Sequence, residues 1–108
     1  MSKADPARDA EILGRLYTVI QSRRGDDPKT SRTAKLFAAG TPKIAQKVGE
    51  EATETVVAAL AQGEKELISE SADLLYHLLV LWADRGVTPA QIFAELAGRE
   101  GKPDPRGV

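Results

Sequence analysis

The sequence predicts an all-α protein built round a helical hairpin, with helices at about residues 42–62 and 64–84. Nearly every patterned segment has the helical period of about 3.6 residues, and no stretch alternates as a half-buried strand does. Glycine and proline stand where helices would begin and end. The length of 108 residues suits a single domain. We therefore expect one all-α domain over residues 1–108, with flexible segments at 1–8 and 99–108.

The composition excludes several classes of protein. The net charge is −1 and charges of both signs are mixed along the chain, so no basic footprint for nucleic acid is present. Cysteine is absent, which excludes disulfides, thiolate metal sites and a cysteine nucleophile. The N-terminus lacks the apolar core of a signal peptide, and no apolar run approaches the roughly 20 residues of a membrane span. We expect a cytoplasmic protein with no nucleic-acid or membrane partner.

A helix is expected over residues 9–23, because its apolar residues fall on one stripe. The stripe consists of Ile12, Leu13, Leu16, Val19 and Ile20. The next segment, GDDPKTS at 25–31, has the composition of a loop. A short helix is expected over 31–39, with Gly40 as a natural residue for its end.

The hairpin helices have clear boundary signals. Thr41 as N-cap and Pro42 as the first helical residue begin one helix, and Gly63 separates it from the next. The Thr-Pro signal recurs at 88–89 and predicts a last helix to about Ala97. The first hairpin helix is expected to pack through a core stripe of Ile44, Val48, Ala52, Val56 and Ala59.

Four acidic residues of the hairpin lie close to apolar positions. At about 100° per residue, Glu51 lies beside the expected core stripe, and Glu54 follows it on the same ridge. The second hairpin helix is apolar nearly all round, and its narrow polar gap holds Glu70, Asp73, His77 and Asp84. Such a helix is buried on most sides, so its polar gap should lie inside an assembly. Unpaired carboxylates are costly there, so we expect something to neutralise them.

The turn between the helices brings these acids together. A short connection at 62–63 makes the two helices antiparallel. The pair Glu51 and Glu54 is as many residues from this turn as the pair Glu70 and Asp73, so both pairs should lie at the same height on facing helices. Carboxylate oxygens suit a hard divalent cation. Mg²⁺ is favoured over Zn²⁺, because the chain has no cysteine and one histidine. The alternative is that acidic residues lie on a solvated surface, and this is preferred for Glu64, Glu66, Glu95 and Glu100.

Two motifs carry a resemblance to known enzymes. E-E-x-x-E in GEEATE, followed by E-x-x-D in SESADLL, resembles the all-α nucleotide pyrophosphohydrolases of the MazG type. The runs KIAQKVGEEATE and DLLYHLLV are similar to those of the phosphoribosyl-ATP pyrophosphohydrolase family, and the resemblance extends over about residues 13–99. It implies an α-helical homodimer that uses Mg²⁺ to hydrolyse phosphoribosyl-ATP to phosphoribosyl-AMP and pyrophosphate, the second step of histidine biosynthesis.

The resemblance also implies roles for single residues. It makes the E-x-x-E and E-x-x-D pairs the metal ligands: Glu51, Glu54, Glu70 and Asp73. One departure is Arg32, which stands where an aromatic residue is expected in S-x-T.

Two alternatives to this function remain open. One is a house-cleaning nucleoside triphosphate pyrophosphohydrolase of the same fold, and the other is a non-catalytic helical dimer that holds a structural ion.

Candidate residues for the substrate phosphates precede and flank the acids. Lys47 is weighed evenly between a phosphate contact and a salt bridge to a neighbouring glutamate, and Lys43 stands one turn before it. On the preceding short helix, Lys35 and Arg32 are candidates to hold the other phosphates or the phosphoribosyl group, and Thr33 to donate a hydrogen bond there. For all three residues, a plain surface role is weighed evenly with this one.

Three further expectations concern residues near the acids. Glu50 is a candidate general base or partner of the metal site, with a solvated glutamate equally weighted. His77 is expected as a core or dimer-contact histidine, hydrogen-bonded to Asp73, rather than as a metal ligand. A second subunit is expected to cover the apolar residues for which the hairpin is too small, Leu75, Leu79 and Trp82.

Overall fold

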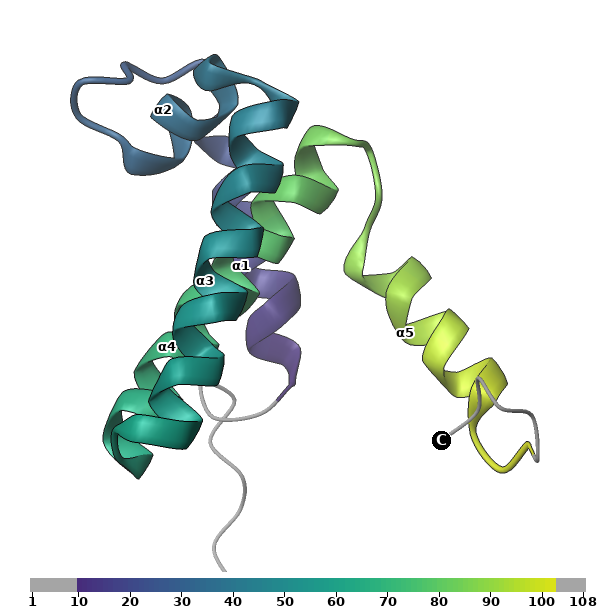
Figure 1. The fold of residues 1–108 in the computed structure, drawn as a ribbon. Coiled ribbons are helices and arrows are strands. Elements are labelled where there is room, and N and C mark those ends of the chain that lie inside the picture. Colours follow the sequence, from purple (N-terminus) through teal and green to yellow (C-terminus); the bar gives the residue numbers. More distant parts are fainter. Residues whose placement is uncertain (1–9, 103–108) are drawn as a thin grey trace, which may run out of the picture.

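The computed structural model describes residues 10–102, which form five helices joined by turns and no strand (Figure 1). The helices are α1 (Glu11–Ser22), α2 (Arg32–Ala39), α3 (Thr41–Ala61), α4 (Glu64–Asp84) and α5 (Pro89–Arg99). This confirms the all-α class and the hairpin, and α5 extends beyond its expected end. The flexible segments predicted at the termini fall largely on residues 1–9 and 103–108, which lie outside the described residues.

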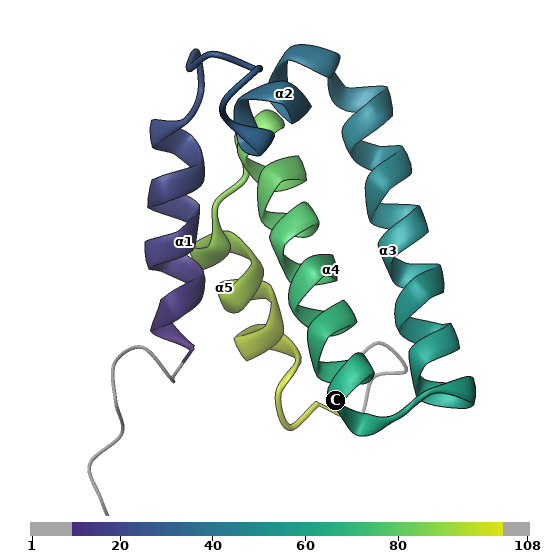
Figure 2. The ribbon, with the colours of Figure 1, turned by 90° about the vertical axis from the view of Figure 1, so that its left-hand side faces the viewer.

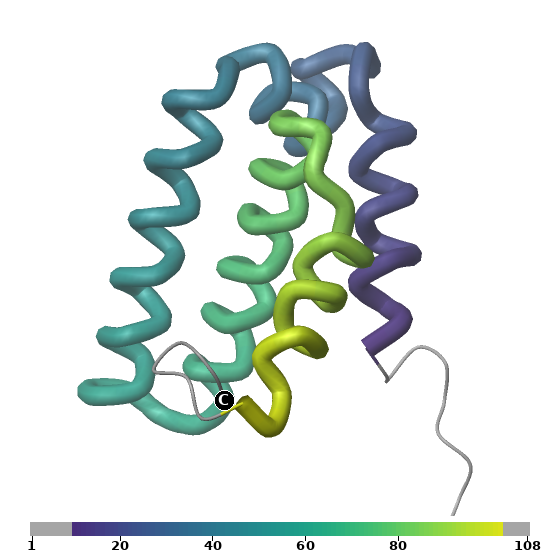
Figure 3. Tube along the Cα trace, turned by 90° about the vertical axis from the view of Figure 1, so that its right-hand side faces the viewer, coloured from purple at the N-terminus to yellow at the C-terminus, as the bar shows by residue number. Residues whose placement is uncertain are grey.

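The central element is α4, which contacts three other helices. It lies antiparallel to α3, and the two share the most extensive helix contact (Figure 2). On its other side lies α1. The short helix α2 crosses the open end of the hairpin, opposite the α3–α4 turn, and lies between α1 and α3. In contrast, α5 stands away from the other helices (Figure 1), lies in front of them in the view of Figure 3, and contacts α1 only slightly. None of the described helices combines the length and apolar character that crossing a membrane requires.

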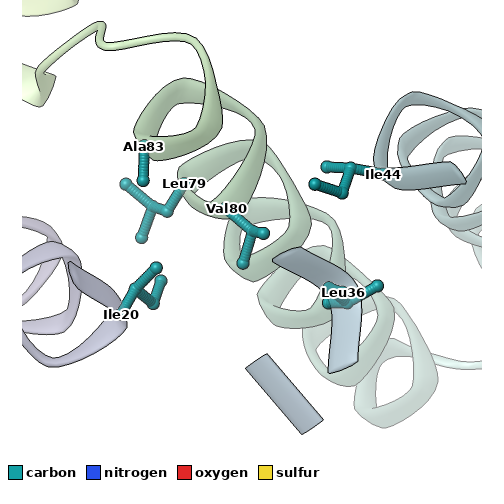
Figure 4. Close-up of a cluster of buried hydrophobic side chains, with 6 residues drawn as sticks. All are labelled: Ile20, Leu36, Ile44, Leu79, Val80 and Ala83. Carbon is teal, nitrogen blue, oxygen red and sulfur yellow. The ribbon is translucent and has the colours of Figure 1, made fainter. Parts of the chain in front are cut away.

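The core gathers apolar side chains from four helices (Figure 4). It consists of Ile20 from α1, Leu36 from α2, Ile44 from α3, and Leu79, Val80 and Ala83 from α4. Leu79 is fully buried within one subunit, so the expectation that a second subunit covers it is wrong. The reason is that α1 and α2 also pack on α4 and cover more of it than α3 alone would. Trp82 also packs against this cluster, whereas Leu75 is 42% exposed.

The core stripe predicted for α3 is confirmed at its start and wrong at its end. Ile44 is buried, and Val48 and Ala52 are half-buried, but Val56 is 56% exposed and Ala59 is also exposed, while Glu51 and Ala58 are buried. The α3 side that meets α4 thus has small and polar residues: Thr55 donates a hydrogen bond of 3.3 Å to the carbonyl oxygen of Glu70. The buried face therefore departs from the apolar stripe toward the C-terminal end of α3, because part of the contact with α4 is polar.

Helix ends follow the expected signals with one exception. Gly40 has a φ of 92°, which favours glycine, and it lies between α2 and α3. Thr41 is the first residue of α3 rather than its cap, so that prediction is wrong. Its hydroxyl donates instead to Asp84 Oδ2 at 2.5 Å, which ties the start of α3 to the end of α4. Thr88 is the cap of α5, as expected.

Candidate metal and phosphate site

Three carboxylates meet where α3 faces α4. Glu51, Glu70 and Asp73 each offer an oxygen, and these oxygens all lie within 4.8 Å of one another. Glu51 is 6% exposed, and the other two are half-buried. Glu70 and Asp73 share a ridge of α4 because residues three apart lie on the same helix face.

Glu54 lies next to this cluster but outside the group of three close oxygens, and its side chain is exposed. The adjacent carboxylate of Glu51 raises the pKa of Glu54, because a protonated Glu54 can share a hydrogen bond with it and because the two negative charges repel. Asp73 acts in the same direction, and Lys47 opposes it. The structure therefore brings three predicted ligands together and leaves the fourth at their edge.

The donor set fits a hard divalent cation. All the groups are carboxylates, and no protein cation lies within hydrogen-bonding distance of the cluster among the described residues: Lys47 Nζ is 3.8 Å from Glu51 Oε2, and Arg32 Nη2 is 3.9 Å from Asp73 Oδ1. Crowded negative charge that is only partly neutralised favours a bound cation with oxygen ligands. The same carboxylates do not resemble a structural zinc site, which takes nitrogen and sulfur ligands.

Glu50 points to a different set of partners. Its carboxylate accepts a hydrogen bond of 2.8 Å from Gln46 Nε2 and lies 3.2 Å from Lys47 Nζ. The hydrogen bond from Gln46 and then Lys47 lower the pKa of Glu50, which makes it a weaker proton acceptor. This geometry favours a role in orienting Lys47 over a role as general base.

Arg32 links the acidic cluster to α2. Its guanidinium carbon lies 4.7 Å from the centre of the Tyr76 ring, and its Nη2 lies 3.4 Å from His77 Nε2. His77 is fully buried, and its Nδ1 lies 2.8 Å from the carbonyl oxygen of Asp73. A carbonyl only accepts hydrogen bonds, so Nδ1 carries the proton and Nε2 accepts from Arg32. The predicted bond between His77 and Asp73 is present, through the backbone.

Tyr76, for which no binding role is predicted from the sequence, contacts two residues of α2. Besides the contact with Arg32, its hydroxyl lies 2.6 Å from Thr33 Oγ1. Thr33 is buried, so the bond braces α2 against α4. No local signal in the sequence indicates these contacts, because the residues are more than 40 positions apart.

A pocket of about 300 Å³ opens between α2 and α3, and two of its lining residues, Arg32 and Lys47, lie within 4 Å of the clustered carboxylates. Its lining includes four of the predicted phosphate-binding residues, Arg32, Lys35, Lys43 and Lys47, together with Glu50 and His77. Two of these, Arg32 and Lys47, also stand closest to the acidic cluster. A basic pocket beside an acidic cluster suits a ligand that carries phosphates and a divalent cation.

Comparison with known proteins agrees with this chemistry. The sequence profile of the family described as phosphoribosyl-ATP pyrophosphohydrolase matches residues 13–100. A relative named phosphoribosyl-ATP pyrophosphatase, from Paramagnetospirillum magneticum, is 68% identical over 95 residues, which cover 88% of this chain and 87% of the relative. Relatives of the same name from Azospirillum brasilense and Rhodospirillum rubrum are 58% and 57% identical; the matches cover 91% and 89% of this chain, and 88% and 82% of those proteins. The chain thus belongs to the phosphoribosyl-ATP pyrophosphohydrolase family, and it is a hydrolase.

Proposed function

We propose that the protein hydrolyses phosphoribosyl-ATP to phosphoribosyl-AMP and pyrophosphate, the second step of histidine biosynthesis, and that this reaction requires Mg²⁺. The observation that carries the proposal is the cluster of Glu51, Glu70 and Asp73 at the edge of a basic pocket. Membership of the family supports the choice of substrate. A homodimer and a cytoplasmic location are part of the same proposal.

Glu51, Glu70 and Asp73 would hold the cation, with Glu54 at the edge of the cluster. When bound, Mg²⁺ supplies neutralisation of phosphate charge and a water of lowered pKa. The carboxylates contribute a fixed, partly buried set of oxygens, since both α3 and α4 are long helices that pack on each other. This rigidity keeps the ligands in place without further reorganisation.

Lys47 and Lys43 would bind the phosphates that become pyrophosphate, because both line the pocket beside the acids. Their positive charges stabilise the negative charge that builds up on the leaving group. Glu50 accepts a charge-assisted contact from Lys47 at 3.2 Å and so holds its ammonium group toward the pocket. Arg32 extends the same positive field toward α2.

The test is release of pyrophosphate by the purified protein. The substrates are phosphoribosyl-ATP and a panel of nucleoside triphosphates, each with Mg²⁺ and with a chelator in excess. Release from phosphoribosyl-ATP that needs Mg²⁺ is the expected result. Preferential release from the other triphosphates would move the protein to a house-cleaning role, and release from none of them would leave the acidic cluster as a structural ion site.

A further inference from the structure

A second hollow lies next to the pocket, on the loop that joins α1 to α2. It has a volume of about 620 Å³ and is lined by Pro28, Lys29, Thr30, Ser31, Arg32 and Lys35. Arg32 and Lys35 line both hollows, so the two adjoin along α2. Of the residues that line the outer hollow, only Arg32 lies within 4 Å of a carboxylate of the acidic cluster, so this hollow is the more distant of the two that form the groove along α2.

The outer hollow has a positive lining with no acidic residue. Lys29, Arg32 and Lys35 supply three cations. Lys29 and Lys35 form no ion pair with any residue in the described range 10–102, although the chain as a whole has a net charge of −1. Positive charge that is left without partners in a groove attracts an anionic ligand.

The loop that carries Lys29 is well ordered by its own hydrogen bonds. The carboxylate of Asp27 accepts from the backbone N–H of Lys29 at 2.9 Å, and its carbonyl oxygen accepts from the N–H groups of Thr30 and Ser31. Ser31 Oγ then accepts from the N–H of Ala34 and caps α2. Both acids of this loop therefore have partners of their own: Asp27 is bonded to backbone groups, and Asp26 Oδ2 lies 3.9 Å from Arg23 Nη1. Lys29 lines the hollow without either of them as an ion-pair partner.

The proposed substrate has two separate anionic ends, and this inference rests on the proposed function. Its triphosphate belongs beside the carboxylates and the inner pocket. Its second phosphate is a monoester on the additional ribose, on the opposite side of the adenine base. A ligand placed in the groove with its triphosphate at the acids would direct this second phosphate along α2, away from the cluster.

We propose that the outer hollow is the subsite for this phosphate, in which Lys29 acts with Lys35 and Arg32 as the group that distinguishes phosphoribosyl-ATP from ATP. Both nucleotides present the same triphosphate to the metal site, so only contacts with the phosphoribosyl group separate them. A buried or grooved site that binds a charged group rejects the analogue without it, because its own charges are then left unpaired.

The test compares ligands with and without the phosphoribosyl group, in chelator so that no hydrolysis or metal binding contributes. The affinities of phosphoribosyl-AMP and AMP are measured by calorimetry for the wild type, Lys29→Gln and a matched control, Lys65→Gln, which alters an exposed lysine at the start of α4. We expect phosphoribosyl-AMP to bind the wild type at least about 10-fold more tightly than AMP, from a charge-assisted phosphate contact. In Lys29→Gln most of this ratio should be lost, and in Lys65→Gln it should persist.

Steady-state kinetics with Mg²⁺ supply the second measurement. Lys29→Gln should raise KM for phosphoribosyl-ATP several-fold, and Lys29→Arg should restore KM. Equal wild-type affinity for phosphoribosyl-AMP and AMP, or an affinity ratio that survives Lys29→Gln, would overturn the subsite. Failure of the proposed function is a separate result: it would appear as a wild type that releases no pyrophosphate from phosphoribosyl-ATP, whatever the affinity ratio.

Discussion

Glu51 is the most buried of the proposed ligands, and its replacement tests the metal site most directly. Glu51→Gln keeps the size of the side chain but removes one negative charge from the cluster. We expect Mg²⁺-dependent activity to fall by about 100-fold or more, as for a lost metal ligand. Without Mg²⁺ the melting temperature should stay the same or rise, because repulsion with Glu54 is relieved.

The measurement is pyrophosphate release together with thermal melting, with and without Mg²⁺. Mg²⁺ should raise the melting temperature of the wild type and have little effect on Glu51→Gln. Glu64→Gln is the control, since Glu64 is exposed on the same hairpin and lies outside the cluster. A variant that loses activity and unfolds at the same time would argue for a structural role.

The raised pKa of Glu54 predicts a pH dependence of cation binding. The pKa of Glu54 in the folded state lies above the ordinary value of 4.5, so the folded protein binds a proton at a higher pH than the unfolded chain does. The cation-free folded protein therefore gains stability as pH falls through the folded-state pKa, and this gain is complete below 4.5. Protonation removes a charge that favours the cation. Mg²⁺ affinity should therefore fall as pH falls from neutral toward 4.5, and fall less in Glu54→Gln; calorimetric titration along this series checks the prediction, and equal losses would contradict it.

At the level of single residues, the sequence predicts the acidic cluster better than it predicts the pocket. Glu70 and Asp73 are fixed by helical spacing, and Glu51 by the position of the turn, so the cluster follows from local rules. The contacts of Arg32 with Tyr76 and His77 depend on how α2 lies across the hairpin. Helix periodicity gives no information on that placement.

Among the elements, the junction between α2 and α3 depends on one glycine. Gly40 has a φ of 92°, a conformation in which a side chain is strained, so Gly40→Ala should reduce the free energy of unfolding by about 1–2 kcal/mol. Gly14→Ala is the matched control: the position lies inside α1 with nothing within 4 Å of an added Cβ, so the same substitution should stabilise by up to about 1 kcal/mol. Urea denaturation measures both; equal effects of the two changes would contradict the assignment of strain to Gly40.

The elements also show why helix boundaries are easier to predict than helix faces. Boundaries depend on glycine, proline and capping residues within a few positions, and α4 begins and ends where the sequence places it. A buried face depends on the neighbouring helix. In α3 that face is centred on Glu51, Thr55 and Ala58, where α4 packs closely, and Val56 lies on the outside.

At the scale of the whole molecule, several apolar side chains have too few partners within one subunit. Leu75 on α4 is 42% exposed, and on α5 Phe93 and Leu96 are 41% and 49% exposed. Within the described residues, α5 makes few contacts with the other helices, so its apolar side is left largely uncovered. Apolar surface of this kind favours burial between subunits, which is the physical basis for the proposed homodimer.

A charge on that side of α5 should weaken the dimer. Leu96→Glu places a carboxylate on the apolar side, whereas Ala94→Glu places the same charge at an exposed position on the other side of the same helix. We expect the dissociation constant from sedimentation equilibrium to rise at least about 10-fold for Leu96→Glu, because burying an unpaired charge is costly. Ala94→Glu should leave it unchanged. If both variants behave alike, or if the wild type sediments as a monomer at micromolar concentration, the α5 side is not a subunit interface, and the exposed leucines must be covered in some other way.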